Sequence, residues 1–124
     1  MSQDKVADAL NQIMNAKRAR KSVVTLKAHS KLLLSILAIA KLKGYIKNYK
    51  ADGVKLAIEL GRINGCNAIK PRYFIAVEDI EKYTKRYLPA KDIGILILTT
   101  NQGLMTHQTA LEKNIGGGLL AYIY

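Results

Sequence analysis

Five consecutive residues that follow the most apolar segment of the chain are suited to recognising a polar partner by hydrogen bonding. They are Thr99, Thr100, Asn101, Gln102 and Gly103. Their side chains donate and accept hydrogen bonds without adding charge, and the glycine permits close approach of the backbone. Asn and Gly are also common in turns, so an ordinary connection between a strand and a helix explains the same residues. The local pattern alone favours that ordinary connection.

The pattern of apolar residues on either side predicts the elements that hold this run. Residues 95–98 (Ile-Leu-Ile-Leu) have no polar face, which predicts a strand buried on both sides. Thr106 can cap a brief helix that continues to Lys113, and Asn114 can end this helix in the left-handed backbone conformation. A terminal apolar strand over residues 119–124 closes the sheet. The polar run is therefore predicted to be a loop held rigidly by a core strand.

Basic residues of the N-terminal half form a second candidate site. The chain has 20 Lys and Arg against 9 Asp and Glu, a net charge of +11. Residues 1–70 hold 14 basic and 4 acidic side chains (+10), and residues 71–124 hold 6 and 5 (+1). This excess points to a polyanionic partner, either nucleic acid or an anionic membrane, although most charged runs are only solvated surface. The candidate phosphate contacts are Lys17, Arg18, Arg20, Lys21, Lys27 and Lys31.

A third candidate site is the sequence Lys70-Pro71-Arg72-Tyr73. The proline restricts the backbone φ angle, Arg72 can form two hydrogen bonds to a phosphate, and Tyr73 can stack on a base. Packing of Tyr73 within a strand explains that residue equally well. Lys70 and Arg72 join the candidate contacts to a nucleic-acid backbone.

The sequence contains no catalytic constellation that we recognise. It has neither a phosphate-binding loop nor a dinucleotide-binding turn, and its carboxylates are scattered. Cys66 stands alone, which excludes an intrachain disulfide and favours a packed apolar residue in a reducing compartment. His29 and His107 each lie beside a predicted helix start, where an imidazole can help with capping. We expect a protein that is not an enzyme and needs no cofactor, metal or small-molecule substrate; a small enzyme with an unrecognised site is an alternative.

The pattern predicts an α+β chain of two domains, residues 1–63 and 64–124, because residues 61–67 are rich in Gly and Asn. The first domain is predicted to lay two helices on a small three-stranded sheet. Its second helix is capped by Ser30, and its hairpin turns at Asp52-Gly53. The second domain is predicted to be a mostly antiparallel small sheet with short helices, with a strand over residues 71–77.

The chain is expected to be cytoplasmic. Its first residues include Asp4, Lys5 and Asp8 and lack the apolar core of a secretory signal. The longest apolar run, residues 32–40, would span roughly 13 Å as a helix, against about 30 Å of bilayer hydrocarbon. A basic module that binds an anionic membrane surface is an alternative, although the chain has no Trp and one Phe.

Several stretches of the chain resemble a known family. The order Leu-Thr-Thr-Asn-Gln-Gly-Leu-Met-Thr-His at residues 98–107, then paired glycines and a closing apolar strand, resembles the C-terminal signature of small-subunit ribosomal protein eight. Upstream, Lys70-Pro71-Arg72-Tyr73 and the run Glu-Lys-Tyr-Thr-Lys-Arg-Tyr-Leu-Pro at residues 81–89 resemble its archaeal and eukaryotic branch. The resemblance covers nearly the whole chain.

The resemblance implies a structural component of the small ribosomal subunit, on the cytoplasmic ribosome and beside other small-subunit proteins. It would bind the central domain of the small-subunit RNA and support its folding and assembly, with residues 99–103 as the principal site for bases and riboses. The contacts to the RNA backbone would be Lys17, Arg18, Arg20, Lys21, Ser30, Lys31, Lys70 and Arg72. Asn101 and Gln102 depart from the usual serine-rich loop, and Gly118 replaces a glutamate of many bacterial relatives.

Overall fold

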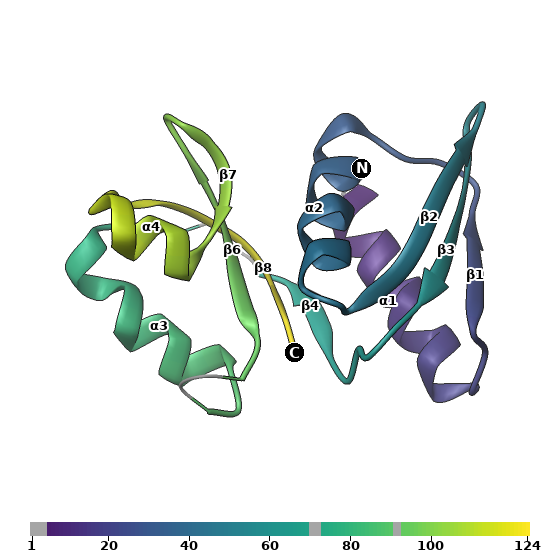
Figure 1. Cartoon of the computed structure of the whole chain (residues 1–124), viewed down its shortest axis with the longest axis horizontal. Coiled ribbons are helices and arrows are strands. Elements are labelled where there is room, and N and C mark those ends of the chain that lie inside the picture. Colours follow the sequence, from purple (N-terminus) through teal and green to yellow (C-terminus); the bar gives the residue numbers. More distant parts are fainter. Residues whose placement is uncertain (1–4, 70–72, 91–92) are drawn as a thin grey trace. The chain divides into compact units, whose positions relative to one another are not determined.

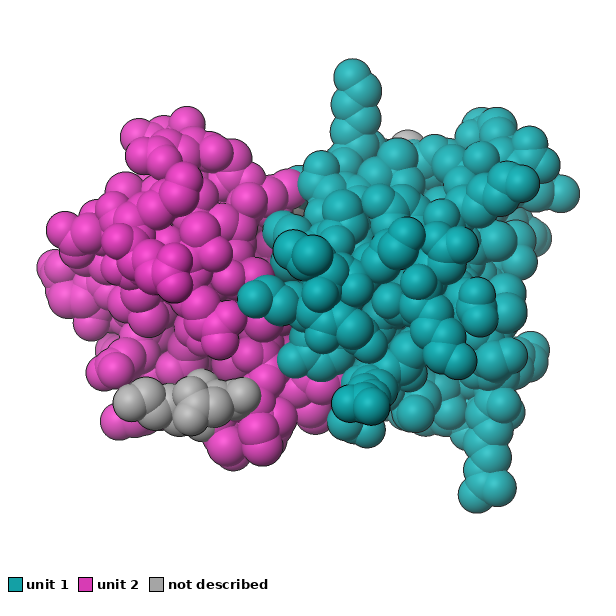
Figure 2. Space-filling model, in the orientation of Figure 1, with its two compact units in different colours: residues 1–67 teal, residues 68–124 magenta. Residues whose placement is uncertain are grey.

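The computed structural model describes residues 5–69, 73–90 and 93–124, and the chain divides into two compact units. Unit 1 comprises Met1–Asn67 and unit 2 comprises Ala68–Tyr124 (Figures 1 and 2). The predicted α+β class is confirmed, because helices and two antiparallel sheets account for most of the described chain. The units divide at the C-terminal end of the Gly- and Asn-rich segment, four residues beyond the boundary expected from the sequence.

Unit 1 consists of two helices on a three-stranded antiparallel sheet. The helices are α1 (Lys5–Arg18) and α2 (Lys31–Leu42), and the strands are β1 (Val23–Leu26), β2 (Ile46–Asp52) and β3 (Lys55–Leu60), in the order β1-β3-β2 (Figure 1). Burial alternates along β3, because one face of the sheet meets the helices and the other meets solvent. The core of this unit therefore lies between the helices and a single face of the sheet.

Local signals set the ends of these elements. The Ser30 hydroxyl accepts a hydrogen bond from the Leu33 N–H at 3.2 Å, which caps α2 as predicted. The hairpin turn lies one residue later than predicted, because Asp52 pairs with Lys55 and leaves Gly53 and Val54 as the turn. Val54 is 72% exposed because it occupies the turn.

Unit 2 is built on a sheet with the strand order β4-β8-β6-β7, and β5 also pairs with β8; the first two residues of β4 are the last two of unit 1. The strands are β4 (Cys66–Ala68), β5 (Phe74–Ile75), β6 (Ile95–Thr100), β7 (Gly103–Thr106) and β8 (Gly117–Ile123). The 3-10 helix η1 (Val77–Asp79) leads into α3 (Ile80–Tyr87), and α4 (His107–Lys113) follows β7 (Figure 1). Side chains of Ile80, Leu96 and Leu98 belong to one buried cluster that the helices share with the sheet.

The predicted strand over residues 71–77 is wrong at its C-terminal end. Only Phe74 and Ile75 are in a strand among the described residues of that range, and residues 71 and 72 lie outside the described part. From Ala76 the chain turns into η1, where Glu78 and Asp79 occupy the first turn of a helical segment. Acidic side chains favour that position because they face the positive end of the backbone dipoles.

Candidate nucleic-acid interface

The polar run at residues 99–103 is the tip of a tight hairpin and not an open loop. Strand β6 continues through Thr100, which pairs with Gly103 at the start of β7, so only Asn101 and Gln102 form the turn. Gly103 has φ +106°, a left-handed conformation that favours glycine. The sequence pattern did not indicate the pairing of β6 with β7, because β7 is only four residues long and runs directly into α4.

The hairpin uses two of its polar side chains internally. The Thr100 hydroxyl donates to the Gly103 carbonyl at 2.8 Å and accepts from the Gln102 N–H at 3.1 Å. The Gln102 Oε1 accepts from Lys113 Nζ at 3.3 Å. Thr99 and Asn101 are exposed, and neither side chain has a hydrogen-bond partner within the described part of the chain. Thr99 and Asn101 are thus the side chains free to bind a partner, and Thr100 shapes the turn that presents them.

The base of the hairpin is fixed by buried groups. Leu96, Ile97 and Leu98 in β6 are each 0% exposed. The buried His107 accepts a hydrogen bond from the Leu96 N–H at its Nδ1, at 3.1 Å, which ties the start of α4 to β6. The cap of α4 is Thr106, as predicted, and the His107 ring bonds to the neighbouring strand β6. The polar tip therefore stands on a rigid support.

Four cations gather at the C-terminal end of α1, around a hollow of about 470 Å³. The hollow is lined by Lys17, Arg18, Arg20 and Lys21, together with Ser22, Leu60 and Gly61. All four basic side chains are exposed, and none forms an ion pair or a side-chain hydrogen bond with another described residue. We call these four residues the basic hollow. Its unpaired charges can attract an anion from solvent.

The backbone at the basic hollow is strained. Arg20 has φ +61°, one of two positive values at non-glycine residues in the described part of the chain. The Lys21 N–H donates to the Ala16 carbonyl at 2.9 Å and the Arg20 N–H donates to the Lys17 carbonyl at 3.0 Å. This is the helix end that glycine usually occupies, so an arginine there costs conformational energy. The position keeps a long cationic side chain where stability alone would favour glycine.

The remaining predicted backbone contacts of unit 1 lie elsewhere. Lys31 is the first residue of α2 and Lys27 precedes that helix. The start of α2 and the end of α1 lie at opposite ends of the unit (Figure 1). The basic set predicted from the sequence is therefore divided between two places. Sequence spacing could not show this, because the extended β1 separates the two groups.

A comparison with known families decides the identity of the fold. Residues 4–124 match the family model described as ribosomal protein S8. The chain belongs to the ribosomal protein S8 family. The resemblance seen in the sequence is confirmed at the level of the family.

Membership of the S8 family makes the chain a ribosomal protein of the small subunit that binds ribosomal RNA and contacts other ribosomal proteins. S8 proteins are structural, ribosome-associated components, and the family is not one of enzymes. None of the helices in the described segments is long and apolar enough to cross a membrane. Those segments also contain no group of three His, Cys, Asp or Glu side chains placed to hold a metal ion.

The third predicted site falls largely outside the described residues. Lys70, Pro71 and Arg72 are not among the described residues, so their predicted contacts stay predictions. Tyr73 is described and is 37% exposed, and its ring centroid lies 6.1 Å from that of Tyr83 in α3. Lys82 Nζ lies 5.9 Å from the Tyr83 ring. Tyr73 is thus already part of an aromatic contact with α3.

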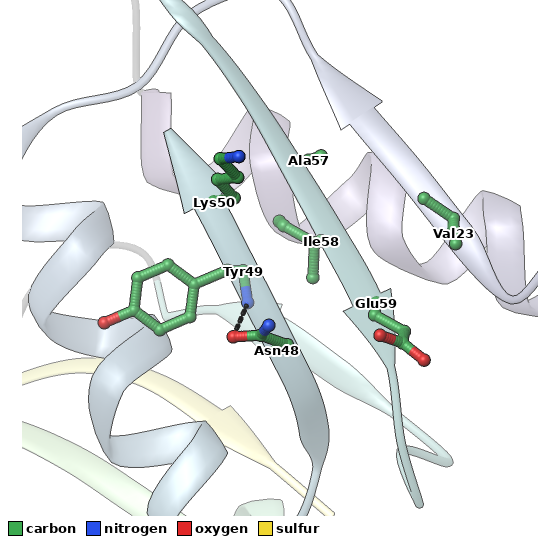
Figure 3. Close-up of a pocket in the computed structure, with 7 residues that line it drawn as sticks. All are labelled: Val23, Asn48, Tyr49, Lys50, Ala57, Ile58 and Glu59. Atoms are coloured by element: carbon green, nitrogen blue, oxygen red, sulfur yellow. Dashed lines mark hydrogen bonds between the residues drawn. The ribbon is translucent and has the colours of Figure 1, made fainter. Parts of the chain in front are cut away.

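A shallow hollow of about 170 Å³ opens on unit 1 across all three strands, from Val23 to Lys50 and Glu59 (Figure 3). Asn48 accepts a hydrogen bond from the Tyr49 N–H at 2.9 Å through its Oδ1. Glu59 is the single carboxylate in its lining.

The buried thiol of unit 1 is the described group with the most perturbed titration. Cys66 is 7% exposed, and its Sγ donates to the Leu10 carbonyl of α1 at 3.6 Å. Burial raises the pKa of the Cys66 thiol to about 12. The thiol therefore stays protonated near neutral pH and packs as an apolar group, which agrees with the role expected from the sequence.

Proposed function

We propose that this S8 protein, of the archaeal and eukaryotic branch, binds the central domain of the small-subunit ribosomal RNA and helps that domain to fold during assembly. It does so without catalysing a reaction. The observation that carries the proposal is the neutral β6–β7 hairpin, in which two unpaired polar side chains follow directly after the buried residues 95–98 of β6. A rigid, uncharged surface of this kind suits the bases and 2′-hydroxyls exposed at a distorted RNA helix.

The hairpin provides the contacts to bases and riboses. Thr99 and Asn101 bind RNA directly, because their side chains have no partner within the described chain. Thr100 and Gln102 hold the turn in shape through their own hydrogen bonds, and Gly103 lets the RNA backbone come close. Thr100 is in this sense a positioning residue. The Gln102 amide nitrogen is still available to donate.

The cations provide the contacts to phosphates. Lys17, Arg18, Arg20 and Lys21 of the basic hollow bind the RNA backbone at one end of unit 1. Ser30 and Lys31 bind it at the start of α2, where the Ser30 hydroxyl hydrogen remains free although its oxygen caps the helix. Lys70 and Arg72 add to the same function. Contacts of this kind fix the register of the protein on the RNA and carry little sequence information.

The proposal is tested by binding of the full chain to a central-domain RNA fragment and to an unrelated RNA duplex. Replacing Thr99 and Asn101 with alanine removes two hydrogen bonds of about 0.5–1.5 kcal/mol each. The affinity for the fragment should therefore fall about 5- to 150-fold. Affinity for the unrelated duplex stays constant, because no charge is removed. The salt dependence of binding is also unchanged.

A matched variant controls for loss of exposed polar groups in general. Replacing the exposed Thr25 and Asn11 of unit 1 with alanine changes the same residue types and should leave both affinities as they are. Equal losses on the two RNAs from the hairpin variant would mean that the hairpin only supports the fold, and specificity would then have to lie at residues 70–73.

A further inference from the structure

Four residues on four different strands form one row across the sheet of unit 2. Phe74 of β5 pairs with Gly118 of β8, Gly118 pairs with Thr99 of β6, and Thr99 pairs with Leu104 of β7. Residues that are directly opposite in antiparallel strands present their side chains on the same face. Phe74 and Thr99 therefore share a face, although 25 positions separate them in the sequence.

This face of the sheet is the one turned away from α3 and α4. The next residue along each strand lies in the cluster that the helices cover, as Ile75, Leu98 and Leu119 show. Successive side chains of a strand point to opposite faces, so the row of Phe74 and Thr99 points away from the helices. Tyr73 does not compete for this surface, because its ring packs near Tyr83 of α3.

Phe74 is the most exposed aromatic side chain in the described chain, at 83%. Its neighbour in the row, Gly118, has no side chain. A Cβ at that glycine would have only two atoms within 4 Å, Thr99 Cγ2 at 3.2 Å and the Tyr73 carbonyl oxygen at 3.9 Å. With strands about 4.8 Å apart, roughly 10 Å separates the backbones of Phe74 and Thr99. Gly118 between them is buried, and the Thr99 methyl group is the side-chain atom nearest to its Cα–Cβ direction.

We propose that Phe74 is a stacking platform for one unpaired nucleobase of the ribosomal RNA. The base packs against the exposed phenyl ring, and the Thr99 hydroxyl on the same face of the sheet hydrogen-bonds its edge or its ribose. Stacking on an aromatic ring tolerates any base, because every base has a π-face. The inference rests on the proposed function, and it extends the RNA-binding surface from the hairpin tip to the opposite edge of the sheet.

RNA fits this surface better than a protein partner for two reasons. The row is uncharged and holds a single ring next to an unpaired hydroxyl, which suits one flat ligand with a polar edge. The same hydroxyl belongs to the hairpin that carries the proposed base and ribose contacts. A protein interface would instead be expected to bury a contiguous cluster of apolar side chains around its anchor residue.

The experiment uses the absence of tryptophan from the natural chain. The variant Phe74→Trp then carries a single tryptophan, whose fluorescence should be quenched when the full chain binds the central-domain fragment, because a stacked base contacts the indole. Leu111→Trp, at an exposed position of α4 in the same unit, is the control and should not be quenched. An unrelated RNA duplex should quench neither variant.

Affinity provides the second readout. Phe74→Ala should bind the fragment about 5- to 150-fold more weakly, the range of one lost base stack, and Phe74→Trp should bind within about threefold of the natural chain. Gly118→Val would press on the Thr99 methyl group and displace this proposed contact, so it should also weaken binding. Because Phe74 is exposed, its replacement leaves the buried core intact.

Two outcomes would overturn the stacking role and leave the proposed function standing. One is an unquenched Phe74→Trp that binds the fragment normally. The other is a Phe74→Ala variant that keeps full RNA affinity and is lost from reconstituted small subunits, which would identify Phe74 as a contact to another protein. If the natural chain itself fails to bind the fragment, the proposed function fails instead, so the two failures can be told apart.

Discussion

The two units of this S8 protein differ in how they can meet RNA. Residues 1–67 carry 13 basic and 4 acidic side chains (+9), and residues 68–124 carry 7 and 5 (+2). Unit 1 presents unpaired cations at the exposed end of a helix. Unit 2 presents neutral side chains next to three strand residues, Leu96, Ile97 and Leu98, that are each 0% exposed. In the proposed function, unit 1 therefore supplies long-range attraction, and unit 2 supplies selective hydrogen bonding and stacking.

The physical requirements of the two tasks explain the difference in rigidity. A lysine or arginine can reach a phosphate from several side-chain conformations, so the exposed end of α1 is sufficient to hold these residues. A neutral hydrogen bond requires its donor and acceptor to lie about 3 Å apart with good alignment. The β6–β7 hairpin meets this requirement because its base is buried and tied to α4 through His107.

Removing charge from the basic hollow should have the largest effect. If Lys17, Arg18 and Lys21 each contact a phosphate, changing all three to glutamine lowers the slope of log affinity against log salt by about 2.7. Between 50 and 200 mM salt, the natural chain should then lose about 40-fold more affinity than the variant. Titrations of the central-domain fragment at several salt concentrations measure this difference.

The control removes the same charge from another place in unit 1. Glutamine at the exposed Lys47, Lys50 and Lys55 changes the net charge equally and should alter the salt slope much less. Equal slopes for the two triple variants would show that the net charge of unit 1 matters and that the basic hollow is not a site.

Alkaline pH should weaken unit 1 through its buried thiol. The pKa of Cys66 is raised in the folded chain to about 12, so the folded state holds this proton more tightly than the unfolded state. The stabilisation is fully present below the unfolded pKa of about 8.5–9 and is lost between there and pH 12. From pH 8 to pH 10, the free energy of unfolding should fall by about 1–2 kcal/mol more in the natural chain than in Cys66→Ala.

Urea unfolding of both chains at the two pH values measures this difference, and the subtraction removes the titration of lysines and tyrosines. An equal fall in both chains would show that the thiol is not protected in the folded state. RNA binding by the hairpin of unit 2 should be unaffected by Cys66→Ala at neutral pH, because the thiol is protonated there.

The smallest expected effect separates stability from binding at Arg20. Arg20→Gly relieves the left-handed backbone and should stabilise the chain by up to about 1 kcal/mol. It should also remove one phosphate contact and lower the salt slope by about 0.9. Asn114→Gly relieves the other positive φ, at the end of α4, and should change stability without changing RNA affinity. If Arg20→Gly binds RNA as well as the natural chain, the strain at this position has no role in binding.

Local features of the fold could be predicted from the sequence. The caps at Ser30 and Thr106 and the left-handed end at Asn114 were found correctly, and the structure confirms them. Each depends on hydrogen bonds between residues no more than about five positions apart, so a short stretch of sequence contains both partners. The hairpin turn at Gly53 was misplaced by one residue because β2 and β3 pair over a longer register than the Asp-Gly signal suggests.

The sequence by itself determined the composition of the protein: the excess of positive charge in the first half, the neutral polar run after the buried strand, and the family. Only the tertiary structure decided which side chains are free. In the folded chain, Thr100 is hydrogen-bonded within the hairpin, the basic residues lie at two ends of unit 1, and Phe74 lies in one row with Thr99. These outcomes depend on strand register between segments far apart in the chain, and a shift of one residue would turn every side chain to the opposite face.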